Sequence, residues 1–224
     1  MAIAFNSATS TNGDASSFTF SHTPAGTDRI LLVYIAYKDS ADSVSGVTFN
    51  TTEDLTLLDS AIHGAVQYGS MWYCLNPSAV TANVVVTLTS SEKAAIGAVS
   101  YTGVEAIETG NFSTTSGQDT NPLNSITTVN ADSLAVHALS VRDRTTGFTD
   151  DVNWTLRYTD NSLGNPANRT AFSRGYDRST PTIGSYTTDT TIDAVEAWVS
   201  ILAELKAAAA VGGFSRGYVI KPFT

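Results

Sequence analysis

The side chains best suited to act as acid, base or metal ligand are three histidines, and their spacing argues against a shared site. His22, His63 and His137 lie far apart in the sequence and in different segments. None has a second ligand at the short spacing of zinc sites, and no H-E-x-x-H, G-x-S-x-G or P-loop motif occurs. His137 stands in the apolar run LAVHALSV, which favours a hydrogen-bonded residue on a sheet face over a catalytic base. We therefore expect no cofactor.

Acidic turns and single carboxylates are the next candidates for chemistry. Acidic segments occur at 12–14 (NGD), 39–43 (DSADS) and 149–151 (TDD). Calcium prefers such oxygen ligands, but none of these segments has EF-hand spacing, and Asp and Asn also favour hairpin turns. Glu196 lies on a predicted strand, yet the sequence offers no second carboxylate to complete a glycosidase pair. We expect polar turns, no metal and no enzyme activity.

The aromatic residues and the single cysteine are the remaining side chains that could bind a ligand or react. Carbohydrates bind exposed aromatic rings, so Trp72, Trp154 and Trp198 are candidates for a glycan site. Each lies within a predicted strand, mostly beside apolar residues, which favours packing in the core. Cys74, the only cysteine, allows no disulfide within the chain, and its place in MWYCL predicts a buried thiol.

Charge and hydropathy limit the partners. The net charge is −9, whereas nucleic-acid binding needs a basic face, so we expect no nucleic-acid partner. The start MAIAFNSATSTNGD has neither the basic residues nor the apolar run of a secretory signal. No stretch approaches the roughly 18 apolar residues that a membrane span needs. We expect no membrane association and synthesis in a reducing cytoplasm.

The sequence predicts an all-β, antiparallel fold. Ser and Thr make up about a quarter of the chain, charged residues only 15%, and short apolar runs alternate with period two. In SFTFSHT, for example, Phe18 and Phe20 share one face. Only 195–210 has helix propensity, and we expect a strand there through about Leu205. The predicted strands are 17–23, 29–38, 45–50, 55–62, 66–75, 83–90, 94–103, 123–129, 133–142, 153–159, 168–176, 182–188 and 194–206.

The chain shows an internal repeat with an offset of about 104 residues. RILLVYIAYKDS parallels SLAVHALSVRDR, and the runs that follow each of them match in order. We predict two pseudo-repeated halves in an antiparallel β-sandwich or jelly-roll-like fold, as two small lobes or as one interleaved sandwich. The predicted parts are a first half (1–105), a polar linker (106–121), a second half (122–207) and an extended C-terminal arm (208–224).

Several of these runs resemble a known family of viral modules. GTDRILLVYIAYKDS, SMWYCLNP, ANVVVTLTSSEKAAIGAVSYTGV, NWTLRY and AWVSILAELK look like the β-sandwich modules of tailed-bacteriophage virion proteins. Such modules occur in capsid decoration (cement) proteins and in tail or fibre proteins. The resemblance implies a structural protein on the capsid surface whose partner is the major capsid protein or another virion subunit, with a homo-oligomer also allowed. The alternative is a carbohydrate- or receptor-binding module of a tail or fibre protein.

The segment beyond the last predicted strand differs from the rest of the chain. Gly212 and Gly213 form a flexible joint, and 214–224 (FSRGYVIKPFT) is apolar with two positive charges and no negative one. An exposed apolar segment is usually covered by something, either the body of its own chain or a partner. We predict a docking arm that joins a neighbouring subunit. Its expected partner-binding residues are Phe214, Arg216, Tyr218, Ile220, Lys221 and Phe223.

The absence of metal-ligand spacing gives a first test. We expect EDTA to leave the melting temperature unchanged, because no acidic turn has the ligand set that calcium requires. The measurement is thermal unfolding with and without chelator, with added calcium as the control. A fall of several degrees in EDTA that calcium reverses would show that a turn binds the ion.

Overall fold

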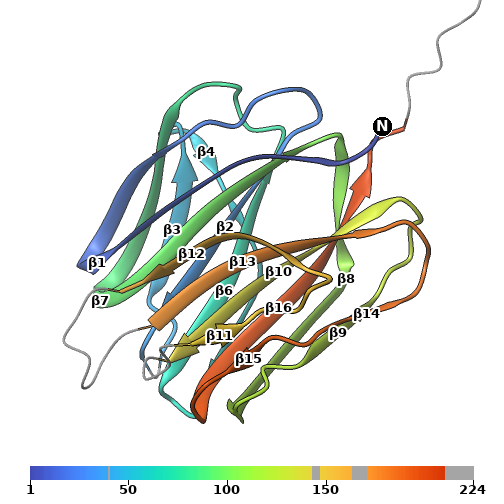
Figure 1. Ribbon diagram of the computed structural model, residues 1–224. Helices are drawn as coiled ribbons and strands as arrows, with labels where there is room; N and C mark the ends of the chain where they lie inside the picture. The colour runs from blue at the N-terminus through green and yellow to red at the C-terminus, as the bar shows by residue number, and fades with distance from the viewer. Residues whose placement is uncertain (40, 143–146, 163–170, 210–224) are drawn as a thin grey trace, which may run out of the picture.

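The computed structural model describes residues 1–39, 41–142, 147–162 and 171–209 (Figure 1). Every regular element in these ranges is a β-strand, and all strand pairs are antiparallel. The predicted all-β, antiparallel class is therefore confirmed. The described part of the chain contains no helix that could cross a membrane.

The first sheet is built from the N-terminal half of the chain. The central strand β2 pairs with β6 on one side and β7 on the other, β5 flanks β6, and both β1 and β3 pair with the long β7. Its strands are β1 (Ala4–His22), β2 (Ile30–Tyr37), β3 (Val44–Phe49), β4 (Glu53–Asp54), β5 (Thr56–His63), β6 (Gln67–Leu75) and β7 (Ala82–Thr102).

The second sheet follows in the C-terminal half, with the strand order β12-β13-β10-β16-β8. Two short pairs, β9 with β14 and β11 with β15, lie outside this five-stranded path. The strands are β8 (Val104–Asp119), β9 (Asn124–Thr127), β10 (Ser133–Arg142), β11 (Phe148–Thr149), β12 (Thr155–Asn161), β13 (Ala171–Thr180), β14 (Ser185–Thr188), β15 (Thr191–Ile192) and β16 (Glu196–Ala207).

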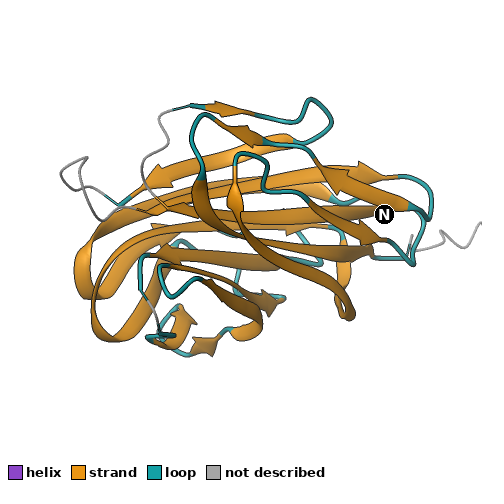
Figure 2. Ribbon diagram, turned by 90° about the horizontal axis from the view of Figure 1, so that it is seen from below, coloured by secondary structure: helices purple, strands orange, loops and turns teal. Residues whose placement is uncertain are grey.

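The two sheets lie face to face as layers (Figure 2), and the buried side chains form three clusters. One cluster lies between the sheets, and each sheet has another on its opposite face. Leu32 of β2 points into the cluster between the sheets, whereas Val33 points into the other cluster of the first sheet. In β10, Val136 likewise points into the cluster between the sheets, whereas Ala135 points into the other cluster of the second sheet. Both central strands are covered on both faces, which explains their nearly continuous apolar sequences.

The predicted strand at the end of the second half is confirmed as β16. This segment does not form a helix despite its helix propensity, because every residue from Glu196 to Leu205 is buried in a strand that pairs on both sides. Tertiary burial overrides local propensity in such a position.

The predicted polar linker at 106–121 is wrong as a description of that segment. Most of it belongs to β8, which pairs with β16. Strand pairing uses backbone groups, so a Ser/Thr-rich segment can form an edge strand with few apolar side chains. Gly117 lies directly beneath the Trp198 ring, where a Cβ would stand 2.4 Å from Cζ2. The segment therefore packs against β16 although its sequence has no alternating apolar pattern.

Three glycines allow the facing strands to approach each other closely. A Cβ on Gly97 of β7 would lie 2.0 Å from Cζ of Tyr158. Gly175 of β13 pairs with Tyr158 in the same sheet, and a Cβ on it would lie 2.9 Å from Cε2 of Tyr34 in the first sheet. Gly69 of β6 is crowded in the same way by Ser140, whose Cβ would be 2.9 Å away. Because real Cβ atoms do not approach other atoms this closely, larger residues here require the sheets to move apart.

The Tyr158 contact yields a prediction about stability. We expect Gly97→Ala to lower the free energy of unfolding by about 3 kcal/mol or more, since the added methyl overlaps a rigid, buried ring. The control is Gly110→Ala in β8, where a Cβ would meet nothing within 4 Å, and we expect it to be neutral or slightly stabilising. Urea unfolding of the two variants measures the difference. Equal stabilities would contradict the packing described here.

Candidate functional site

The partner-binding side chains predicted from the sequence, Phe214, Arg216, Tyr218, Ile220, Lys221 and Phe223, lie outside the described residues. The structure does show where the chain leads toward them. The last strand ends at Ala207, and the N–H of Ala208 donates to the carbonyl of Gly103 at 2.8 Å. This hydrogen bond fixes the exit point beside the junction of the two sheets, near the N-terminus (Figure 1). The arm remains a prediction.

A groove of about 540 Å³ lies at this exit point. We call it the exit groove. Its lining comes from three separate segments, 1–3, 131–134 and 207–208, together with Ser179. Leu134 belongs to the cluster between the sheets, and Ile3 packs against that cluster. The groove is therefore an opening at the edge of the shared core, and its lining mixes polar and apolar groups.

One wall of the exit groove is the turn at 129–133, and a buried carboxylate holds that turn. Glu204 is fully buried and accepts hydrogen bonds from the backbone N–H groups of Val129 and Asn130, both at 2.9 Å. The side-chain amide of Asn111 donates to Glu204 at 2.7 Å, and the Ser133 hydroxyl donates to the carbonyl of Asn130 at 2.9 Å. The wall is thus preorganised by charge-assisted hydrogen bonds.

These donors also set the ionisation of Glu204. Burial alone would raise the pKa of its carboxyl, but the hydrogen bonds from Val129, Asn130, Ser133 and Asn111 together outweigh burial and lower it. Glu204 therefore stays ionised while it braces the wall.

The body of the chain is acidic, whereas the exit groove itself carries one charge of each sign. Asp132 is the only titratable side chain among the described residues that line it, and the Met1 ammonium, which donates to the carbonyl of Ala208, lines it too. The whole chain carries 12 basic and 21 acidic residues, and 210–224 holds two of the basic and none of the acidic ones. The remainder therefore has 10 basic and 21 acidic residues, a net charge of −11. Such a surface attracts positively charged segments, most strongly at low salt.

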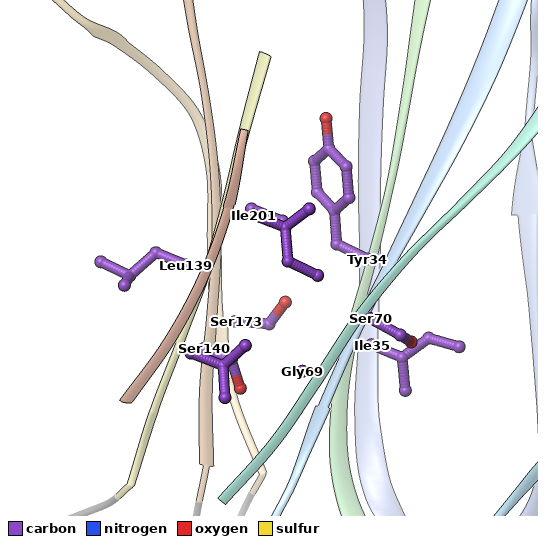
Figure 3. Close-up of a pocket in the computed structure, with 10 residues that line it drawn as sticks. Tyr34, Ile35, Gly69, Ser70, Leu139, Ser140, Ser173 and Ile201 are labelled. Carbon is purple, nitrogen blue, oxygen red and sulfur yellow. The ribbon is translucent and has the colours of Figure 1, made fainter. Parts of the chain in front are cut away.

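A second hollow lies between the two sheets and is too small for a substrate (Figure 3). Its volume is about 10 Å³, and it is lined by Tyr34 and Gly69 from the first sheet and Ser140 and Ser173 from the second. That volume is about one water-sized sphere. Since Ser140 donates to the carbonyl of Tyr68 and Ser173 bonds the Tyr158 hydroxyl, both at 2.7 Å, this pocket is part of the packing between the sheets.

The histidines are placed apart, and two of them are buried. Nε2 of His137 lies 2.9 Å from the Ser200 hydroxyl, and its ring stacks on Tyr176. Burial lowers the pKa of His137 to about 3 and that of His22 to about 4. A neutral histidine beside a serine is chemically a base and a nucleophile, but His137 and Ser200 are 1% and 0% exposed, so no substrate reaches them. His63 lies elsewhere, with Nδ1 3.4 Å from the Ser116 hydroxyl.

The acidic turns use their carboxylates in local hydrogen bonds. Asp42 accepts from the N–H of Val44 at 2.9 Å and Asp151 from that of Asn153 at 2.8 Å, as in Asx turns. Asp150 instead pairs with the guanidinium of Arg174 at 2.9 Å. Among the residues that the structure describes, no three His, Cys, Asp or Glu side chains gather at metal-binding distance.

The tryptophans and the cysteine are only partly as predicted. Trp154 and Trp198 are buried, which confirms core packing for them, whereas Trp72 is half-buried and donates from Nε1 to the Ser70 hydroxyl at 3.1 Å. Cys74 is half-buried and packs against the outer cluster of the first sheet, so the predicted buried position is met only in part. It lies at the outer end of β6, and burial still raises its pKa, which disfavours the reactive thiolate.

Two structural features escaped the sequence analysis. One is Glu204, whose signal is a lone acidic residue inside the apolar run SILAELK. The other is the ion pair of Arg157 with the buried Asp177, which joins Nε to Oδ2 at 2.6 Å and Nη2 to Oδ1 at 2.9 Å. The Arg157 guanidinium also lies over the Phe5 ring, 4.4 Å from its centroid. This pair links β12 with β13 and has no sequence pattern, because the partners are 20 residues apart.

Comparison with known proteins gives no match: no family model, no curated protein and no solved structure is similar to this chain.

The bracing of the exit groove gives a prediction with a defined pH dependence. We expect Glu204→Gln to lower the free energy of unfolding by about 2 kcal/mol near neutral pH, because an amide cannot accept from all of these donors as a carboxylate does. A carboxyl whose folded pKa is depressed stabilises the fold above its unfolded pKa of 4.5, and that contribution disappears as the pH falls through the folded pKa.

The difference in melting temperature between the wild type and Glu204→Gln should therefore shrink below about pH 4.5. The control is Glu105→Gln, which removes the exposed pair with Lys206 and should change little at any pH. A difference for Glu204→Gln that stays constant from neutral pH to pH 3 would contradict the assigned role.

Proposed function

We propose that this protein is a structural component of a bacteriophage virion, a capsid decoration or cement protein that binds the capsid lattice and stabilises it. The observation that carries the proposal is the exit groove, a preorganised opening placed where the described fold ends and the predicted docking arm begins. The protein acts through buried contact area at a repeated interface, without turnover. It would be made in the host cytoplasm and reside on the capsid surface.

The energetics of the arm fit a protein that works in many copies. Burying large side chains such as Phe214 or Ile220 contributes about 1.5–3 kcal/mol each. Ordering a free residue costs on the order of 1 kcal/mol or more in backbone entropy, and 214–224 contains 11 residues. Because these amounts are comparable, the arm alone binds weakly. Copies already docked on a symmetric lattice raise its local concentration and make it effective.

We also propose the finer fold class, a jelly-roll-like β-sandwich made of two pseudo-repeated halves. The order of strand pairing supports it. The path β5-β6-β2-β7-β1 in the first half corresponds to β12-β13-β10-β16-β8 in the second. The pairs that cross between the sheets correspond as well, since β6 contacts β16 and β13 contacts β7. In this assignment β8 opens the second half, and the boundary falls at Gly103.

The registers of the strand pairs support the repeat at an offset of 104. Ala8 of β1 pairs with Val99, and Phe112 of β8 pairs with Ala203, so both partners shift by 104. The pair of β3 with β7 and the pair of β11 with β15 show the same shift. Val44 lies opposite Leu88 in the first pair, and Phe148 lies opposite Ile192 in the second, so both residues move by 104 positions.

An irregularity recurs at the edge of each half. The pairing of β5 with β6 slips by one residue between Leu57 and Asp59, and that of β12 with β13 slips between Leu156 and Tyr158. Bulges at the same place in both halves support a common origin, because they are retained features of a fold.

The alternative, a carbohydrate- or receptor-binding module of a tail or fibre protein, has less support. Glycan binding needs exposed aromatic rings, and two of the three tryptophans are buried in the core. Trp72 alone keeps part of its ring accessible. A glycan array with the intact protein is the direct comparison, and specific binding there would favour this alternative.

Truncation after Gly213 tests the docking arm. We expect the shortened protein to keep its melting temperature and to bind empty capsids of the phage at least tenfold more weakly than the full chain. Co-sedimentation with capsids gives the affinity and the copy number, and thermal unfolding gives the stability. If the full chain fails to bind at high copy number, the decoration role is wrong. If the shortened protein unfolds, residues 214–224 belong to the core.

A further inference from the structure

We propose that two copies of this chain exchange halves, so that the N-terminal half of each copy (residues 1–103) packs against the C-terminal half of the other (from Val104 on). The partner is a second copy, because it carries the same two faces that already fit each other within one chain. Three features of the molecule carry the proposal: the contacts between the halves, the symmetry of these contacts and the hinge at Gly103. The exchange does not depend on the decoration role.

The contacts between the halves are almost entirely contacts of side chains. Within the described ranges, every strand pair joins two strands of the same half. The halves meet in the cluster between the sheets, where Leu32 and Tyr34 share a core with Val136 and Ile201 (Figure 2). Such an interface resembles one between two separate proteins, so the same contacts form when the second half belongs to another copy.

These contacts are reciprocal. The strand β6 contacts β16 as β13 contacts β7, and at the sides β1 contacts β12 as β8 contacts β5. Asn12 of β1 donates to Asp160 of β12 at 2.7 Å on one side, and Thr114 of β8 donates to Asp59 of β5 on the other. Reciprocal contacts are typical of a two-fold dimer interface. The halves therefore meet as two subunits do, although one peptide connection joins them.

That connection is a single residue. The strand β7 ends at Thr102 and β8 begins at Val104, with Gly103 between them at a φ of 72°. Two backbone hydrogen bonds hold it, from Gly103 to the carbonyl of Thr27 at 3.1 Å and from Val104 to that of Asp28 at 2.8 Å. A connection this short favours exchange, because a change of conformation at Gly103 directs the C-terminal half toward another copy.

The substitution Gly103→Val tests the hinge. A Cβ at this position would lie 2.5 Å from the carbonyl oxygen of Ala2, and a β-branched residue disfavours a positive φ, so the closed hinge is strained and an extended one is not. The matched control is Gly110→Val in β8, where a Cβ would meet nothing within 4 Å. Each full-length protein is refolded from urea at low and at high concentration, and analytical ultracentrifugation gives its mass.

We expect the wild type and Gly110→Val to be mainly monomeric, with a dimer that increases with the refolding concentration. Gly103→Val should give at least tenfold more dimer at the same concentration. This dimer should persist for hours after dilution, because its chains separate only by opening the core between the sheets. A folded Gly103→Val that stays monomeric overturns the proposal, and so does a dimer that dissociates within minutes.

Complementation tests the exchange itself without altering the hinge. A Cβ on Gly69 would lie 2.9 Å from that of Ser140, so Gly69→Arg blocks the interface from the N-terminal half and Ser140→Arg blocks it from the C-terminal half. Each variant alone should fail to fold. An exchanged dimer of the two contains one wild-type interface, so we expect an equimolar mixture refolded together to form a folded 1:1 dimer. A mixture that gives no folded dimer overturns the proposal even if Gly103→Val does not fold.

Discussion

The close approach of two β-sheets across the Tyr158 ring is the constraint on which the rest of the structure depends. The ring fits between the sheets because Gly97 and Gly175 have no side chain where it lies, and Gly69 makes similar room for Ser140. This spacing lets apolar residues of both sheets share one cluster, while each sheet keeps a second cluster on its opposite face. The two halves of the chain are thereby joined by a core that neither half completes alone, and removing one half would expose a large apolar face.

The exit groove follows from the same arrangement. The sheets meet at Gly103, and there the edge of their shared cluster stays open between the N-terminal residues and the turn at 129–133. Glu204 keeps that turn in place at the cost of burying a carboxylate, which is tolerable only because several donors surround it. The histidines and serines that resemble catalytic groups serve the packing of the sheets instead.

The sequence predicts the buried strands well and the polar ones poorly. The apolar runs of β2, β10 and β16 are sufficient to predict these strands. The polar strand β8 and the first part of β1 lack that signal, because backbone pairing with a buried neighbour holds them in place. The match of Tyr158 to Gly97 and the groove lining are tertiary contacts between distant segments, which no local pattern encodes. The docking arm is predicted from the composition of 214–224, the diglycine before it and its place after the last predicted strand, and residues 210–224 lie outside the described ranges.

The central claim is that the core shared by the two sheets makes the whole chain one cooperative unit. Differential scanning calorimetry of the intact protein tests it directly. The account predicts a single transition whose calorimetric enthalpy equals the van't Hoff enthalpy, because neither half is stable once the cluster around Tyr158 opens. Two resolved transitions, or a calorimetric enthalpy about twice the van't Hoff value, would show that the halves unfold independently and would contradict the account.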